Sequence, residues 1–184
     1  ENISFIKIDY NPQYNPNVFR YFIYRDFLHQ HLQQINSLFI TDITDVVVVN
    51  NPFIASFFIE NPTSLFCGDE PKILNNDWMN AHSENLRENI VDYATYESTF
   101  GNETLLNCGI IGGNASIIFN FLQQLCAIHQ HANYNNKTAY TGDMGAFNYL
   151  ARTVFNQQLI HGAPVNTVFK GYEIDRNDCW FRHK

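Results

Sequence analysis

The chain has 184 residues, a formal net charge of −7 and no cluster of Lys and Arg residues, which argues against nucleic acid as its main partner. Its length suits one domain, covering residues 1–184, that can bury a proper core. No apolar run approaches the roughly 20 residues of a membrane-spanning helix, so we expect no transmembrane segment in this chain.

The cysteines are far apart and form no C-x-x-C pair, which excludes a zinc ribbon or a thioredoxin-like site. We expect buried free thiols rather than a disulfide framework. N-x-S/T sequons occur in a chain so rich in Asn that several arise by chance, so they favour the secretory-pathway lumen over the cytoplasm only weakly. They lie at Asn2, Asn102, Asn114 and Asn136.

The first helix is expected after residue 15. Residues 3–8 alternate well enough for a strand, and Asn15-Pro16 is typical of a helix start, with Asn at the N-cap and Pro in the first turn. Apolar residues at helical spacing extend this helix to about residue 34. Arg20 on this helix either lies along its solvated surface or reaches a bound phosphate.

Two acids stand between the next two apolar runs. Residues 38–40 and 46–49 have the composition of strands, and Asp42 and Asp45 lie in the T-D-x-x-D segment that joins them. Ligands in open α/β sheets bind outside the carboxyl ends of strands, which makes this pair a candidate for holding a divalent cation. In the alternative interpretation Asp42 caps the turn and Asp45 is solvated.

Strands and helices alternate in the rest of the chain. We expect a strand at 64–67, a turn at 68–71, a modest helix around 81–91, and a strand at 104–111 that enters a helix capped by Asn114. Another helix opens near Asp143, for which the simplest role is the N-cap. This order predicts an α/β sandwich with a mostly parallel central sheet flanked by helices.

Histidines on the expected helices occur as two pairs at i, i+2, whose side chains point to different sides of a helix. We therefore expect surface residues rather than metal pairs at His29, His31, His129 and His131. Near the C-terminus, the aromatic residues Trp180 and Phe181 are expected to hold the end of the chain in place.

Four segments in this order resemble the GT-A-type glycosyltransferases, the nucleotide-diphospho-sugar transferase superfamily. Residues 41–53 look like its D-x-D region, and residues 107–113 are similar to its N-x-G segment beside the donor sugar and the acceptor. Asp143 with Asn148 looks like its D-Q-x-x-x-N helix start, and His183 like the late histidine of its metal site. The resemblance spans essentially the whole chain.

The resemblance implies a metal-dependent glycosyltransferase that moves a sugar from a nucleotide-diphospho-sugar to a hydroxyl acceptor on a glycan, protein or lipid. The implied ligands of Mn²⁺ or Mg²⁺ are Asp42, Asp45 and His183, a set that suits Mn²⁺. Asp143 would accept hydrogen bonds from sugar hydroxyls as the catalytic residue. The implied donor-binding residues are Arg20, Asn107, Gly109, Gly112, Gly113 and Asn148.

Two departures from the family pattern stand out. The spacing is D-x-x-D rather than D-x-D, which leaves open which acid binds the metal directly. Only residues 1–17 precede the first good helix, so we expect part of the N-terminal base-binding unit of the implied GT-A (Rossmann-like) sandwich to be missing, reduced or cut from this chain. No general base is evident, which leaves inversion and retention open.

Two other functions are alternatives to the transferase. Nucleotidyltransferases use an N-terminal glycine-rich basic loop that this sequence lacks. A non-catalytic binding or interaction domain on the same fold, with a decayed donor site, is the alternative. A missing base pocket would favour this alternative, and an intact metal site would count against it.

Overall fold

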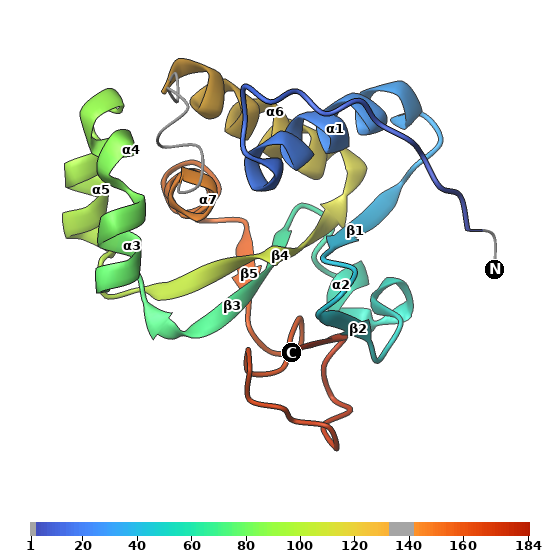
Figure 1. Cartoon of the computed structure of the whole chain (residues 1–184). Helices are drawn as coiled ribbons and strands as arrows, with labels where there is room; N and C mark the ends of the chain where they lie inside the picture. The colour runs from blue at the N-terminus through green and yellow to red at the C-terminus, as the bar shows by residue number, and fades with distance from the viewer. Residues whose placement is uncertain (1–2, 133–141) are drawn as a thin grey trace.

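The computed structural model describes residues 3–132 and 142–184, and its centre is a four-stranded mixed sheet in the order β1-β4-β3-β5 (Figure 1). Helices pack around the sheet, which confirms the α/β class. The strands are β1 (Ser37–Thr41), β2 (Val46–Val48), β3 (Leu65–Ile73), β4 (Thr104–Asn114), β5 (Leu159–His161) and β6 (Phe181–His183). The helices are α1 (Pro16–His31), η1 (Pro52–Ile54), α2 (Ser56–Ile59), α3 (Asp77–His82), α4 (Glu84–Asn89), α5 (Tyr93–Phe100), α6 (Ala115–His131) and α7 (Gly142–Thr153).

The expectation of a mostly parallel sheet is wrong. β4 pairs antiparallel with both β1 and β3, and only β3 and β5 pair in parallel. Helices α3, α4 and α5 follow β3 and lie at one end of the sheet, so the chain turns back beside β3 instead of crossing a face (Figure 1). β1, β3 and β5 therefore point the same way, with β4 reversed between β1 and β3.

Both faces of the sheet are buried. Leu65 and Cys67 of β3 belong to a large core cluster with α1, α6 and α7, whereas Phe66 between them packs into a second cluster with Trp180 and Phe181. Successive strand residues point to opposite faces, so β3 contributes to both cores. Burial on two sides also explains why the central strand β4 is a nearly continuous apolar run.

The C-terminal segment is anchored, as expected from its aromatic residues. β6 pairs with β2 in an antiparallel register that sets His183 opposite Val46. Trp180 N–H donates to the carbonyl of Pro164 at 2.7 Å, and Phe181 N–H donates to that of Val165 at 3.0 Å. These bonds and the aromatic cluster fix the position of His183 beside the end of β1.

Several local expectations need correction. Residues 3–8 form no strand and their apolar side chains are exposed, because no sheet edge pairs with them in the described residues. The expected turn at 68–71 lies inside β3, which continues to Ile73 with irregular pairing to β4. Residues 77–100 form three short helices rather than one.

Other local expectations are confirmed. Asn15 caps α1, with its side chain accepting from Asn17 N–H at 2.9 Å. Asn114 stands at the N-cap of α6, although its side chain bonds the Pro62 carbonyl and Ser37 instead of the helix. All four cysteines are buried and free.

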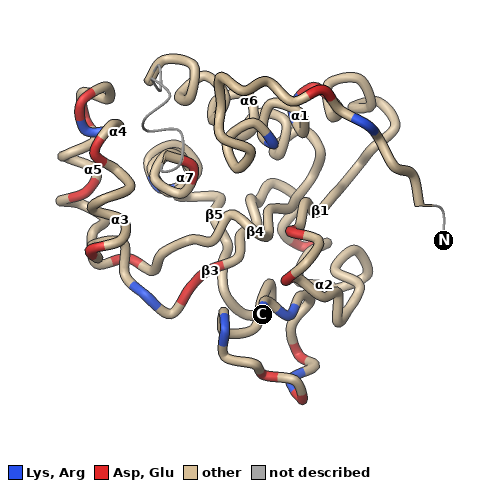
Figure 2. Tube along the Cα trace, in the orientation of Figure 1, with Lys and Arg blue, Asp and Glu red and all other residues tan. Residues whose placement is uncertain are grey.

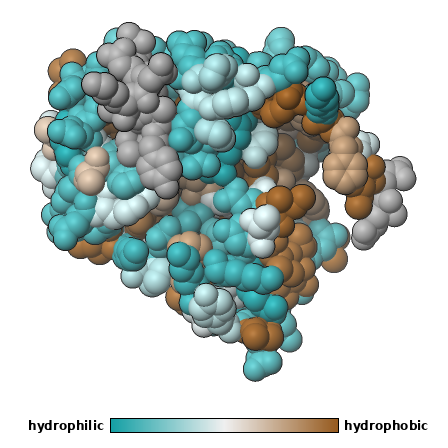
Figure 3. All heavy atoms as spheres, viewed as in Figure 1, coloured by the Kyte–Doolittle hydropathy of each residue, from teal (hydrophilic) through white to brown (hydrophobic). Residues whose placement is uncertain are grey.

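An apolar area lies on the outer surface around η1 and α2. Phe53 and Ile54 of η1 and Phe57 and Ile59 of α2 are exposed, and Figure 3 shows hydrophobic residues gathered on this side of the molecule. None of the helices in the described ranges combines the length and the apolar composition needed to cross a bilayer.

His129 contradicts the expectation of surface histidines. It is fully buried in α6, and its ring stacks on that of Tyr21 with the centroids 5.8 Å apart. His129 lies four residues after Leu125, which places both on the same helix face. Burial lowers the pKa of His129 to about 3, so the folded protein holds it neutral.

We expect this histidine to make the fold acid-sensitive. The unfolded chain binds a proton at His129 near pH 6.5 and the folded chain does not, so the stabilisation is complete above that pH and declines as the pH falls toward about 3. Between about pH 7 and about pH 5 the wild type should lose roughly 2 kcal/mol more unfolding free energy than His129→Phe. Urea unfolding at both pH values measures this difference, and equal losses would contradict it.

Candidate functional site

Three segments that are far apart in the sequence meet around Gly109 of β4. A Cβ built on Gly109 would lie 2.8 Å from Asn107 Oδ1, 2.8 Å from His183 Cε1 and 3.1 Å from Asp42 Oδ2. No side chain fits there unless these groups move. The absence of a side chain at Gly109 thus lets an amide, an imidazole and a carboxylate approach one point.

Strand pairing places the two acids of the T-D-x-x-D segment. Asp42 follows β1 directly, and its N–H donates to the Gly109 carbonyl at 3.0 Å, which extends the β1–β4 ladder by one bond. Asp45 precedes β2, where the β2–β6 pairing brings His183 Nε2 to 3.8 Å from Asp45 Oδ2. The prediction that both acids lie at the carboxyl end of a strand holds for Asp42, which follows β1, but not for Asp45, which comes directly before the amino end of β2.

Arg20 of α1 joins the acids from the helical layer. Its Nη1 donates to Asp42 Oδ1 at 2.6 Å, and its Nη2 lies 3.9 Å from Asp143 Oδ2. Figure 2 shows the acidic positions after β1 near the middle of the molecule, between α1 and the C-terminal segment. The guanidinium, which is always charged, therefore sits between two carboxylates from different elements.

Asp143 lies in the first turn of α7, inside the helix rather than at its N-cap. Its side chain is 11 % exposed, and this burial raises its pKa, although the Met144 N–H and Arg20 oppose the shift. A carboxylate at the edge of a polar cluster can accept a hydrogen bond from a ligand hydroxyl.

Asn107 is held in place by a partner that the sequence did not reveal. Its Oδ1 accepts from Gly109 N–H at 2.6 Å, while its Nδ2 donates to Glu70 Oε1 of β3 at 2.8 Å. Glu70 is buried beside β4. Glu70 falls in the turn predicted at residues 68–71, although it stands three residues after the apolar run 65–67, much as Asp42 stands two residues after the run 38–40.

His183 is buried and neutral in this arrangement. Burial lowers the pKa of His183, and the nearby Asp45, Asp42 and Glu70 only partly offset this effect. A neutral imidazole keeps a lone pair for binding a metal. His183 Nδ1 and Asp45 Oδ1 are both buried without a hydrogen-bond partner, which is a costly state for polar atoms.

The side chains at this site have the chemistry of divalent-cation ligands, but they are not arranged around a single ion. Carboxylate oxygens with one imidazole nitrogen suit Mn²⁺. Two such atoms, Asp45 Oδ1 and His183 Nδ1, have no hydrogen-bond partner among the described residues. Within residues 3–132 and 142–184, however, no three His, Cys, Asp or Glu side chains are arranged to share one ion. Arg20 forms an ion pair with Asp42, so a cation could bind Asp42 only if this ion pair rearranged.

Three residues expected to bind the donor have structural roles instead. A Cβ on Gly112 would lie 2.1 Å from the ring of Phe39, and one on Gly113 would lie 2.6 Å from the Ser64 carbonyl. Asn148 is fully buried, and its amide bonds both the N–H and the carbonyl of Leu106. These contacts pack β4 against its neighbours and fix α7 on β4.

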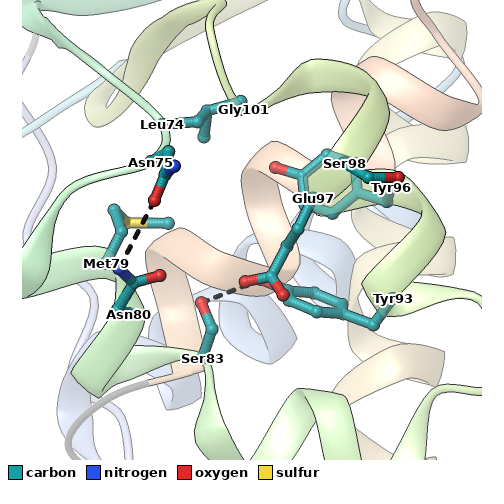
Figure 4. Close-up of a pocket in the computed structure, with 10 residues that line it drawn as sticks. All are labelled: Leu74, Asn75, Met79, Asn80, Ser83, Tyr93, Tyr96, Glu97, Ser98 and Gly101. Carbon is teal, nitrogen blue, oxygen red and sulfur yellow. Dashed lines mark hydrogen bonds between the residues drawn. The ribbon is translucent and has the colours of Figure 1, made fainter.

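A well-formed pocket lies apart from the site around Gly109. A pocket of about 270 Å³ lies between the segment that follows β3 and helices α3 and α5, where Tyr93 donates to Ser83 Oγ at 2.9 Å (Figure 4). Asn75 and Asn80 lie on its other side. It shares no lining residue with the site around Gly109, whose buried polar atoms and converging charges we consider the stronger indication of function.

Neither a protein-family model nor a curated protein matches this chain.

Proposed function

We propose that this protein is a metal-dependent glycosyltransferase of GT-A type that takes a nucleotide-diphospho-sugar as donor and a hydroxyl group as acceptor. The observation that carries the proposal is the convergence around Gly109. Asp42, Asn107 and His183 come from three motifs that were chosen from the sequence for one function, and they approach a single point. Residues from unrelated segments have no general reason to converge, so their convergence supports a shared function.

The charges of the site suit a diphosphate that enters with a cation. Asp42, Asp45, Asp143 and Glu70 supply four carboxyl groups, and the Arg20 guanidinium lies near two of them, Asp42 and Asp143. A second cation, Lys170, is close enough for its charge to act on His183. The excess of acid attracts a cation. If Asp42 bound a cation, Arg20 would lose this ion pair and could donate to phosphate oxygens in the bidentate geometry that guanidinium favours.

Asp42, Asp45 and His183 would hold Mn²⁺ or Mg²⁺, and the ion would act as a Lewis acid that neutralises the charge on the departing diphosphate. The chain's own residues do the positioning. The sugar would lie beside the groups that converge on Gly109, and Asp143 would accept a hydrogen bond from one of its hydroxyls. Glu70 keeps the Asn107 amide from rotating.

The second candidate function is a non-catalytic binding domain on the same fold. The ion pair between Arg20 and Asp42, at 2.6 Å, favours it, because this pair neutralises the acid that would bind a metal. A chain of this kind would bind nucleotide weakly and without need of a divalent cation.

Thermal unfolding with a panel of nucleotide sugars distinguishes the two functions. We expect at least one nucleotide sugar to raise Tm by roughly 5–10 °C at about 100 times its Kd, and only when Mn²⁺ is present. Stabilisation arises because the ligand binds only the folded chain. Equal shifts with and without Mn²⁺ would favour the binding domain, and the absence of a shift with any nucleotide sugar would overturn the transferase.

A further inference from the structure

A second pocket, of about 370 Å³, borders the candidate site, and we call it the lysine pocket. Lys72 of β3 and Lys170 line it together with Trp78 of α3. Three contacts connect it to the site. Glu70 lines the pocket and binds Asn107, Met144 in its wall follows Asp143, and the Phe169 ring packs on His183 with the centroids 4.5 Å apart.

The two lysines share the pocket with the acidic residue Glu70 but form no ion pair with it. Neither forms an ion pair anywhere in residues 3–132 and 142–184, although the chain as a whole carries a net charge of −7. Five arginines, at positions 20, 25, 87, 152 and 176, have acidic partners, whereas Arg182, Lys7 and Lys184 form no ion pair with the described residues. Two free cations in one pocket of an acidic protein are suited to an anionic ligand.

Backbone conformation sets Lys170 apart from other surface lysines. Its φ is 57°, in the left-handed region that side-chain-bearing residues rarely adopt. Such strain is concentrated at ligand sites, where a backbone is held in an unfavourable conformation to aim a side chain. Here it sets the Lys170 ammonium 5.1 Å from the centroid of the Phe169 ring, which itself contacts His183.

Apolar and aromatic surface completes the pocket. Trp78 is 44 % exposed, with one ring face stacked on His82 at 3.8 Å between centroids. Leu105 and Met144 add apolar surface. A volume of about 370 Å³ with an aromatic side chain and a few polar groups is the usual form of a small-molecule site, and it suits one sugar ring with a charged substituent.

Resting on the proposed function, we propose that the lysine pocket receives the acceptor, and that this acceptor is a sugar carrying a phosphate or carboxylate group. Lys72 and Lys170 bind the anionic group, and Trp78 contacts the ring. A hydroxyl of the acceptor then lies toward Asp143 and the point above Gly109. The donor diphosphate is the other anion that these lysines could bind, so the test has an arm for each source.

Titration calorimetry with glucose, glucose 6-phosphate and glucuronic acid tests the acceptor arm. We expect both anionic sugars to bind about tenfold more tightly than glucose, since each can form charge-assisted hydrogen bonds to the ammonium groups. The double variant Lys72→Gln/Lys170→Gln should lose this preference and keep its affinity for glucose. Lys7→Gln, which removes an exposed lysine outside the pocket, should behave as wild type.

UDP and GDP, each with Mn²⁺, test the donor arm. If the lysines serve the acceptor, the double variant binds the nucleotides within about twofold of wild type. A tenfold loss of nucleotide affinity would assign the lysines to the diphosphate and overturn the acceptor assignment. Equal affinities for glucose and the anionic sugars would also overturn it. Lysine-dependent binding of anionic sugars without any Mn²⁺-dependent nucleotide binding would leave the pocket standing and remove the transferase.

Discussion

Gly109→Ala should abolish Mn²⁺-dependent nucleotide binding while leaving the protein folded. The added methyl group would lie 2.8 Å from Asn107 Oδ1, 2.8 Å from His183 Cε1 and 3.1 Å from Asp42 Oδ2. All three groups must retreat, and they are the groups to which we assign sugar and metal binding. We expect a loss of at least about 100-fold in affinity, because metal sites tolerate displacements of only a few tenths of an ångström. Titration calorimetry with UDP or GDP and Mn²⁺ measures it.

The matched control is Gly68→Ala on the neighbouring strand β3. Its methyl group would meet Ile110 Cβ at 3.3 Å, an apolar contact that needs only a small adjustment. Gly68→Ala should therefore keep nucleotide affinity within a few-fold of wild type. A folded Gly109→Ala protein with wild-type affinity would show that the point above Gly109 is not the ligand site.

Asp45→Asn should weaken Mn²⁺-dependent nucleotide binding by about 10–100-fold, the range seen when the support of a metal site is lost. A neutral amide replaces an ionised oxygen, while Asp45 Oδ1, which has no hydrogen-bond partner among the described residues, is not needed for stability. The same substitution should leave nucleotide binding in the absence of a divalent cation unchanged. Calorimetric titrations with and without Mn²⁺ separate the two effects.

Asp26→Asn on α1 provides the comparison. Its carboxylate is largely exposed and pairs with its neighbour Arg25 at 2.7 Å, so removing its charge alters net charge without touching the site. It should leave nucleotide affinity at the wild-type value. Equal affinities of wild type and Asp45→Asn in the presence of Mn²⁺ would exclude Asp45 as a ligand.

Local chemistry explains what could be predicted from the sequence. The start of α1 at Asn15 and Pro16 and the strand that ends before Asp42 depend on neighbouring residues, whose preferences are strong. The grouping of Asp42, Asn107, Gly109 and His183 was inferred from motif order, and the structure brings them together. Their shared role in metal and sugar binding stays a prediction.

Long-range contacts explain what could not be predicted. Glu70 supports Asn107 across two strands, and His129 is buried by Tyr21 of another helix. Asn148 fitted a ligand-binding motif equally well, but its amide is consumed by the backbone of Leu106. In each case the partner lies tens of residues away in the chain, so the contact cannot be predicted from the neighbouring sequence.

By itself, then, the sequence determined which residues can carry charge, cap a helix or leave room for a ligand, because these are properties of single side chains and their neighbours. Only the tertiary structure decided that β4 runs against β1 and β3, that Arg20 neutralises Asp42, and that two lysines line one pocket beside the site. Strand direction and ion pairing depend on how distant segments return to one another, and that is set by the packing of the whole chain.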